Sequence, residues 1–125
     1  MANAGPANKE FVFIWLNLMR ERGAHPCIGR DLEEIISSSG LFDEIEAKKV
    51  VVPYSQSQDM AQTAESKLGL AWMRNAERVA ADLPTRFASQ GYTPELVKQH
   101  LSELVDIDRG VETDMYFVCA QRRLL

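Results

Sequence analysis

Apolar residues recur at helical spacing near the start of the chain. This pattern predicts a helix over 9–22 that ends at Gly23, with apolar neighbours on more than one side. Residues 1–8 (MANAGPAN) are small and polar, and we expect them to be frayed and disordered. The main stripe of the predicted helix consists of Phe11, Ile14, Trp15 and Leu18.

The next stretch changes from helical spacing to a run of β-branched residues. Inward-facing leucine and isoleucine residues predict a helix over 30–39, and Gly40 is its expected stop. Three consecutive valines then predict a strand over 43–53 that ends at Pro53. The polar residues 55–63 that follow are expected to be a linker.

Helical spacing returns in the second half of the chain. A helix is predicted over 65–83, where Pro84 bends or breaks it, with a short helical piece continuing to Gln90. The sequence TPE predicts the start of a further helix, over 94–105, because it offers a threonine cap, a proline in the first turn and an acid beside it. Residues 115–122 (MYFVCAQR) are predicted to be a closing strand.

These elements predict an α+β protein with a single domain over 9–125, in which helices pack on a small strand pair. Two strands do not make a stable sheet by themselves. Either the helices cover the strands or another chain adds to them. We therefore expect a homodimer or a heteromeric complex.

Composition narrows the possible partners. A net charge of −4 argues against nucleic acid and anionic membrane, and no cluster of basic residues provides a footprint for either. The apolar run FVFIWLNLM is too short to span a bilayer and lacks a signal-peptide pattern. Two cysteines give no disulfide framework, so we expect a reducing, cytoplasmic location.

The stretch 30–54 (RDLEEIISSSGLFDEIEAKKVVVPY) resembles the late part of class I S-adenosylmethionine-dependent methyltransferases. The resemblance continues through LGLAWMRNAERV, GYTPELVKQHLSELVDI and DMYFVCAQRR. It is similar to the C-terminal region of fungal methyltransferases of secondary metabolism, in which a helical insertion separates the last two strands. The resemblance implies an antiparallel strand pair from the C-terminal part of a Rossmann-like fold.

The half of the family that binds the cofactor has no counterpart in this chain. No glycine-rich G-x-G-x-x-G loop occurs, and Gly69 stands alone in a predicted helix. By the resemblance, methyl transfer by this chain alone is not expected. We predict that it uses no cofactor and does not bind S-adenosylmethionine.

Two polar residues interrupt apolar stripes and are the candidate catalytic residues. His100 falls inside the apolar arc of the predicted helix over 94–105, where it could act as a general base or as a core histidine bonded to a backbone carbonyl. Asn75 lies in the inward stripe of the predicted helix over 65–83, where its amide needs a partner, either a ligand carbonyl or a backbone group.

Trp15 and Trp72 are candidate substrate-binding residues, because they could form the walls of a pocket for a flat organic molecule. Inward aromatic residues also serve as plain core. His25 and Cys27 lie two positions apart, but a structural zinc site needs about four ligands, so we predict no metal.

Two functions follow from these residues. The first is a truncated methyltransferase-like enzyme of natural-product biosynthesis, a cofactor-independent cyclase or isomerase whose small-molecule substrate is polyketide-like or polycyclic. The second is a non-catalytic subunit or substrate-binding half that completes a separate methyltransferase chain. An excised domain is a third possibility.

Overall fold

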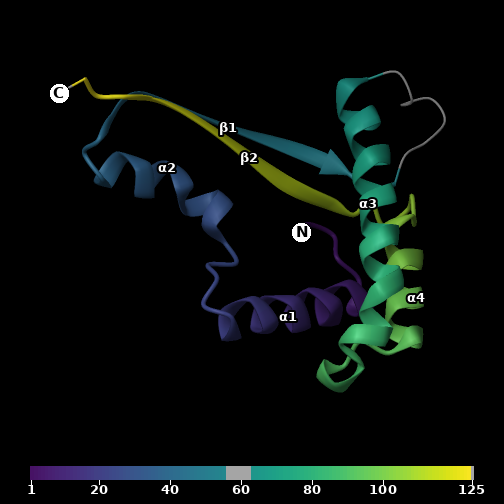
Figure 1. Ribbon diagram of the computed structural model, residues 1–125. Coiled ribbons are helices and arrows are strands. Elements are labelled where there is room, and N and C mark those ends of the chain that lie inside the picture. Colours follow the sequence, from purple (N-terminus) through teal and green to yellow (C-terminus); the bar gives the residue numbers. More distant parts are fainter. Residues whose placement is uncertain (56–62, 125) are drawn as a thin grey trace.

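The computed structural model describes residues 1–55 and 63–124 and has an α+β architecture (Figure 1). Within these residues, four α-helices accompany one two-stranded antiparallel sheet. The elements in chain order are α1 (Pro6–Glu21), α2 (Ile28–Ser38), β1 (Phe42–Pro53), α3 (Ala64–Arg86), the 3-10 helix η2 (Ala88–Gln90), α4 (Pro94–Leu104) and β2 (Glu112–Arg122). The predicted fold class is confirmed.

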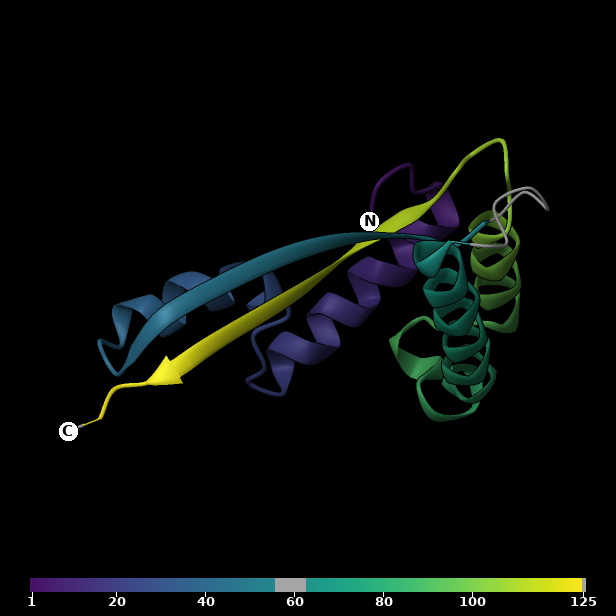
Figure 2. The ribbon, with the colours of Figure 1, turned by 90° about the horizontal axis from the view of Figure 1, so that it is seen from above.

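The strands form a long curved ribbon that extends away from the helices α3 and α4 (Figures 1 and 2). The register pairs Val52 with Thr113 near α3 and Phe42 with Arg122 at the far end. Helix α2 packs on one face of the ribbon, where Gly29 meets the ring of Tyr116. Helix α1 packs against α4.

Most predicted elements agree with the structure to within a few residues. The strand predicted over 43–53 is β1, and the helix predicted over 94–105 is α4, with Thr93 capping it as expected. The short helical piece up to Gln90 is η2. Most of the predicted linker over 55–63 lies outside the described residues.

The chain start differs from the prediction. Helix α1 begins at Pro6 rather than at residue 9, because proline is well suited to the first turn. Residues 1–8 are not frayed: Ala2 exchanges two backbone hydrogen bonds with Glu112, and Asn8 is fully buried. Small polar residues are ordered here by contacts with parts of the chain about 100 positions away, which local sequence cannot reveal.

The sequence predicts that the helix over 65–83 ends before Pro84, but helix α3 continues to Arg86. Proline removes one N–H donor and obstructs the carbonyl of the preceding turn. Here that loss falls in the last turn, where the hydrogen bond from Phe87 N to Leu83 O closes the helix. A proline so close to the helix end shortens the helix little.

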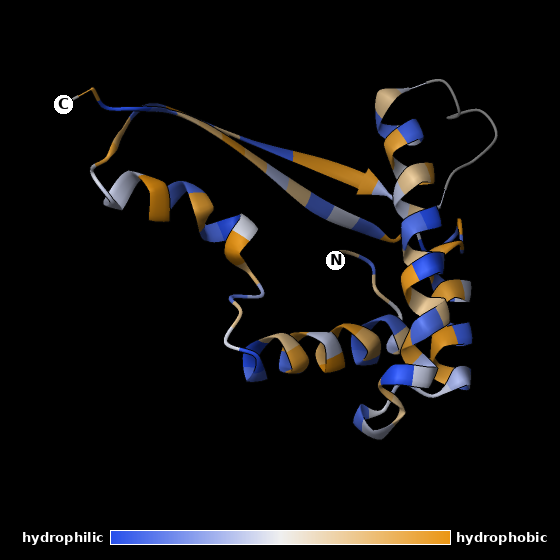
Figure 3. Ribbon diagram, in the orientation of Figure 1, coloured by the Kyte–Doolittle hydropathy of each residue, from blue (hydrophilic) through white to orange (hydrophobic). Residues whose placement is uncertain are grey.

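The core has two parts, both at the helical end of the molecule. One lies between α1, α3 and α4 around Tyr92, and the other joins Tyr54 and Val111 to α3 and α4. The hydrophobic end of β1 next to α3 contributes Val52, which is fully buried (Figure 3). By contrast, α2 has no buried residue. The far half of the ribbon therefore lacks a core of its own.

The solvent-accessible surface area of the chain is larger than expected for a compact protein of its mass. The chain exposes 8762 Å², whereas a compact monomer of 14.1 kDa is expected to expose about 6,700 Å². Large apolar side chains contribute to the excess, among them Phe13, Leu41 and Phe117. A partner that covers part of this surface remains the expectation.

Candidate functional site

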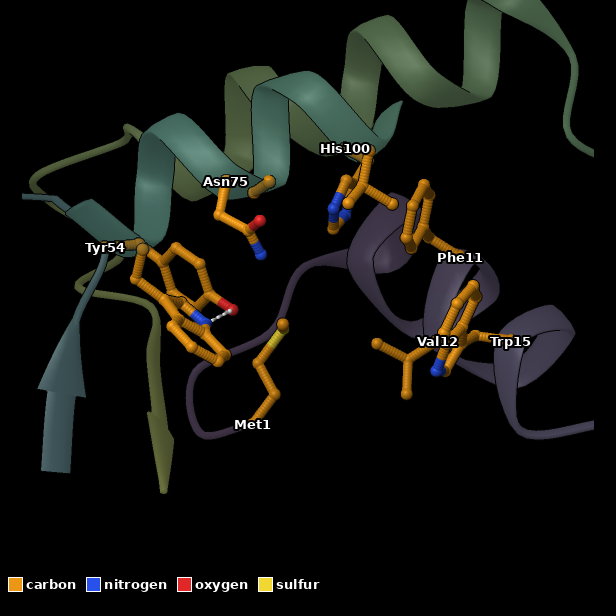
Figure 4. A pocket seen from close by; sticks show the side chains of 10 residues that line it. Met1, Phe11, Val12, Trp15, Tyr54, Asn75 and His100 are labelled. Atoms are coloured by element: carbon orange, nitrogen blue, oxygen red, sulfur yellow. Dashed lines mark hydrogen bonds between the residues drawn. The ribbon is translucent and has the colours of Figure 1, made fainter. Parts of the chain in front are cut away.

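A pocket of about 250 Å³ lies between α1, α3 and α4 (Figure 4). It brings together all four residues that the sequence singled out, from three helices. Its walls are mostly apolar, which suits a flat organic ligand. The lining residues are Met1, Phe11, Val12, Trp15, Tyr54, Trp72, Asn75, Ala76, Val79 and His100.

His100 is held from one side by Asn8, which the sequence analysis did not identify. The Asn8 side-chain nitrogen lies 2.8 Å from His100 Nδ1 and 3.0 Å from the His100 carbonyl oxygen. Since the carbonyl can only accept, this nitrogen is the donor in both contacts. Nδ1 is therefore the acceptor, and the proton of the neutral ring resides on Nε2.

The free ring nitrogen of His100 reaches the pocket. No buried side-chain nitrogen or oxygen lacks a hydrogen-bond partner within 1–55 and 63–124, and Nε2 makes no hydrogen bond there. Nε2 is consequently accessible rather than sealed in the core, and His100 lines the pocket. Its N–H can donate to a ligand.

Burial keeps this histidine neutral. The ring stacks on Phe11 with centroids 3.7 Å apart, and only 4% of the residue is exposed. Desolvation lowers the pKa of His100 to about 4, although the nearby charge of Glu103 acts in the opposite direction. A neutral imidazole with Nδ1 already bonded is a hydrogen-bond donor toward the pocket and a weak base.

Glu103, one turn after His100 on α4, fixes the start of α1. Its two carboxylate oxygens accept from the backbone N–H groups of Ala7 and Asn8, at 3.1 and 2.8 Å. These are unsatisfied donors of a first helical turn, where negative charge is favourable. The contact holds Asn8, and through it the histidine ring, in place.

The contact of the Glu103 carboxylate with the N–H groups of Ala7 and Asn8, which we call the Glu103 clamp, predicts that a substitution at Gly5 lowers stability. An added Cβ there would overlap the Glu103 carboxylate, although the extended backbone of Gly5 suits alanine. We expect Gly5→Ala to lower the free energy of unfolding by about 1–3 kcal/mol, measured by urea denaturation. In a Glu103→Ala background the same substitution should change the free energy of unfolding by almost nothing. An equal loss of stability in both backgrounds would contradict the Glu103 clamp.

The burial and hydrogen bonding of Asn75 differ from those that the sequence predicts. It was expected to be buried with a partner, but it is exposed and makes no hydrogen bond with any described residue. The side chain points into the open centre between Met1, Tyr54 and His100 (Figure 4). The stripe that contains Asn75 faces the pocket rather than closed core, so the amide meets solvent or ligand.

The two tryptophans line the pocket from different sides. The indole N–H of Trp72 donates to the Tyr54 hydroxyl over 2.9 Å, and Trp15 on α1 is 39% exposed (Figure 4). Tyr54, also missed by the sequence analysis, follows Pro53 directly, and an aromatic residue just past a strand was the available signal. Burial raises the pKa of Tyr54, partly offset by hydrogen bonds from Trp72 and Thr113.

Comparisons with known proteins give no relative: no protein-family model, curated protein or solved structure matches this chain. The resemblance to methyltransferases therefore stays a prediction. Within the described residues, no three histidine, cysteine, aspartate or glutamate side chains gather closely enough to hold a metal ion. None of the helices in these ranges is long and apolar enough to cross a bilayer.

Proposed function

We propose that the protein is a cofactor-independent enzyme that binds a polyketide-like ketone in the pocket between α1, α3 and α4 and catalyses its cyclisation. The observation that carries the proposal is His100 itself: it lines an apolar pocket, and the contact of Asn8 with Nδ1 leaves the ring proton on the accessible Nε2. A donor fixed in advance can stabilise negative charge as it develops on a carbonyl oxygen. The tryptophans would confine the flat carbon skeleton.

The chemistry of the lining favours cyclisation over isomerisation by proton transfer. The titratable side chains in the lining are His100 and Tyr54. Neither suits a general base at neutral pH, since Nδ1 of the histidine is occupied and burial raises the pKa of the tyrosine. A cycloaddition within one substrate molecule needs no base. It requires that the carbon skeleton of the substrate is held in a folded conformation and that its conjugated carbonyl is polarised. The pocket can supply both.

Asn75 would be the second polar group. Its amide can donate to the same carbonyl oxygen or hold a neighbouring hydroxyl, and no described residue competes for it. The sequence left two roles open for each residue: a ligand or a backbone partner for Asn75, and a general base or a core position for His100. We keep the ligand-binding role for Asn75 and propose a donor in place of the base for His100.

Ligand titration followed by NMR tests the pocket without knowledge of the natural substrate. The bicyclic ketone α-tetralone should shift the Asn75 side-chain amide and the Trp15 and Trp72 indole signals. Tetralin, which has the same skeleton without the carbonyl, should bind about 5–10-fold more weakly, the difference expected for a lost hydrogen bond. Equal affinity for the two would show that the polar groups do not recognise a carbonyl.

The alternative function, a subunit that completes a separate methyltransferase chain, stays a prediction. It needs a partner with a complementary sheet edge. The observation that favours it is the long strand ribbon with little cover, and the tests of that ribbon below also bear on this alternative.

A further inference from the structure

The outer edge of β2 offers unpaired backbone groups. Glu112 N–H and C=O point away from β1, because both bond to Ala2. Backbone groups alternate in direction along a strand, so those of every second residue after Glu112 also point outward. These residues are Asp114, Tyr116, Val118 and Ala120, and within the described ranges no residue makes a hydrogen bond to these backbone groups.

The two edges of the ribbon differ in how well they resist pairing. The β1 edge has a bulge between Asp43 and Glu46, lysines at 48 and 49, and a terminal proline. Bulges, lysine and proline are features that prevent edge-to-edge association. The β2 edge has no bulge, lysine or proline over 115–120 (MYFVCA), and all six residues are uncharged. Phe117, in the middle of this stretch, is 48% exposed. The β2 edge is therefore the one open to another strand.

The amount of exposed surface fits a second copy of the chain. The excess over a compact monomer is about 2,000 Å² per chain, and obligate homodimers bury about 2,000–5,000 Å² in total. Two identical edges form a closed two-fold pair, which is the commonest oligomer. No further chain needs to be assumed.

We propose that two copies pair antiparallel through their β2 strands, centred on Phe117, to make one four-stranded sheet. The outward-facing groups run from Asp114 to Ala120, and Phe117 is their midpoint. Ala2 already occupies the edge at Glu112, which limits the pairing to this stretch. This register places Phe117 opposite Phe117 of the second copy. It also sets Asp114 opposite Ala120, so that no like charges meet.

Pairing through the β2 strands does not depend on the pocket or on the proposed reaction. Light scattering should give twice 14.1 kDa for the full chain at micromolar concentration. Val118→Pro removes an outward N–H and should give monomers. Ala47→Pro is the matched control, since Ala47 is the register partner of Val118 and its N–H points out from the opposite edge, so it should remain dimeric.

Two measurements do not rely on the proline variants being folded. In the unmodified protein, hydrogen exchange should show protected amides at Tyr116 and Val118 but not at Ala47. Phe117→Cys, in a chain with both natural cysteines replaced by serine, should oxidise to a disulfide-linked dimer, because this pair would lie about 4.5 Å apart at Cα. A 14.1 kDa monomer with fast exchange along the β2 edge would overturn the proposal, as would stable association only with a different protein.

Discussion

His100→Asn is expected to lower the rate of carbonyl-assisted cyclisation about 10²-fold, the scale of losing one preorganised donor. The asparagine oxygen can replace Nδ1 as the acceptor for Asn8, so the contact between α1 and α4 is kept. The Nε2–H that faces the pocket is lost. A suitable assay follows a decatrienone that closes to a fused bicyclic ketone of the same formula, with its spontaneous rate as the reference.

His100→Gln is the matched variant, because it keeps the donor and loses the acceptor of the ring, which is the reverse of His100→Asn. The glutamine amide can place an N–H near the position of Nε2, but it offers Asn8 no acceptor at the position of Nδ1. We expect this variant to lose more stability than His100→Asn and to retain more activity per folded molecule. If both variants lose stability and neither changes the rate of folded protein, His100 is a structural residue only.

The stability of the protein should fall in mild acid through the same histidine. The pKa of His100 is about 4 in the folded state against 6.5 in an unperturbed histidine, so the unfolded chain binds its proton first as pH falls. Stability is therefore complete above pH 6.5 and decreases toward pH 4. A difference of this size corresponds to about 3 kcal/mol, because each pKa unit is worth about 1.4 kcal/mol.

Urea denaturation at a series of pH values measures this loss. His100→Asn should remove most of the slope between pH 6.5 and 4. His25→Asn replaces the only other histidine, which is exposed, and should leave the slope in place. Direct titration of the His100 ring by NMR provides a second check. A midpoint near 6.5 in the folded protein would contradict the burial that underlies both predictions.

Local sequence patterns determined most of the secondary structure. Valines 50–52 and Pro53 predicted β1, and the threonine and proline before Glu95 predicted α4, because strand propensity and helix capping act over a few residues. Helical spacing also indicated that His100 and Asn75 interrupt apolar stripes. It thereby identified residues that line one pocket, together with Trp15 and Trp72.

Only the tertiary structure decided what these residues can do. Asn8 belongs to a segment that looked frayed, and no local pattern shows that it meets His100 from 92 positions away. That contact assigns the proton to Nε2, and it is the reason why we propose a donor where the sequence allowed a general base or a core histidine. Likewise, sequence showed that two strands need cover, but only the outward bonds of Glu112 reveal which edge is open. Hydrogen-bond direction and burial depend on which distant residues meet, whereas helix and strand preferences depend on neighbours in the chain.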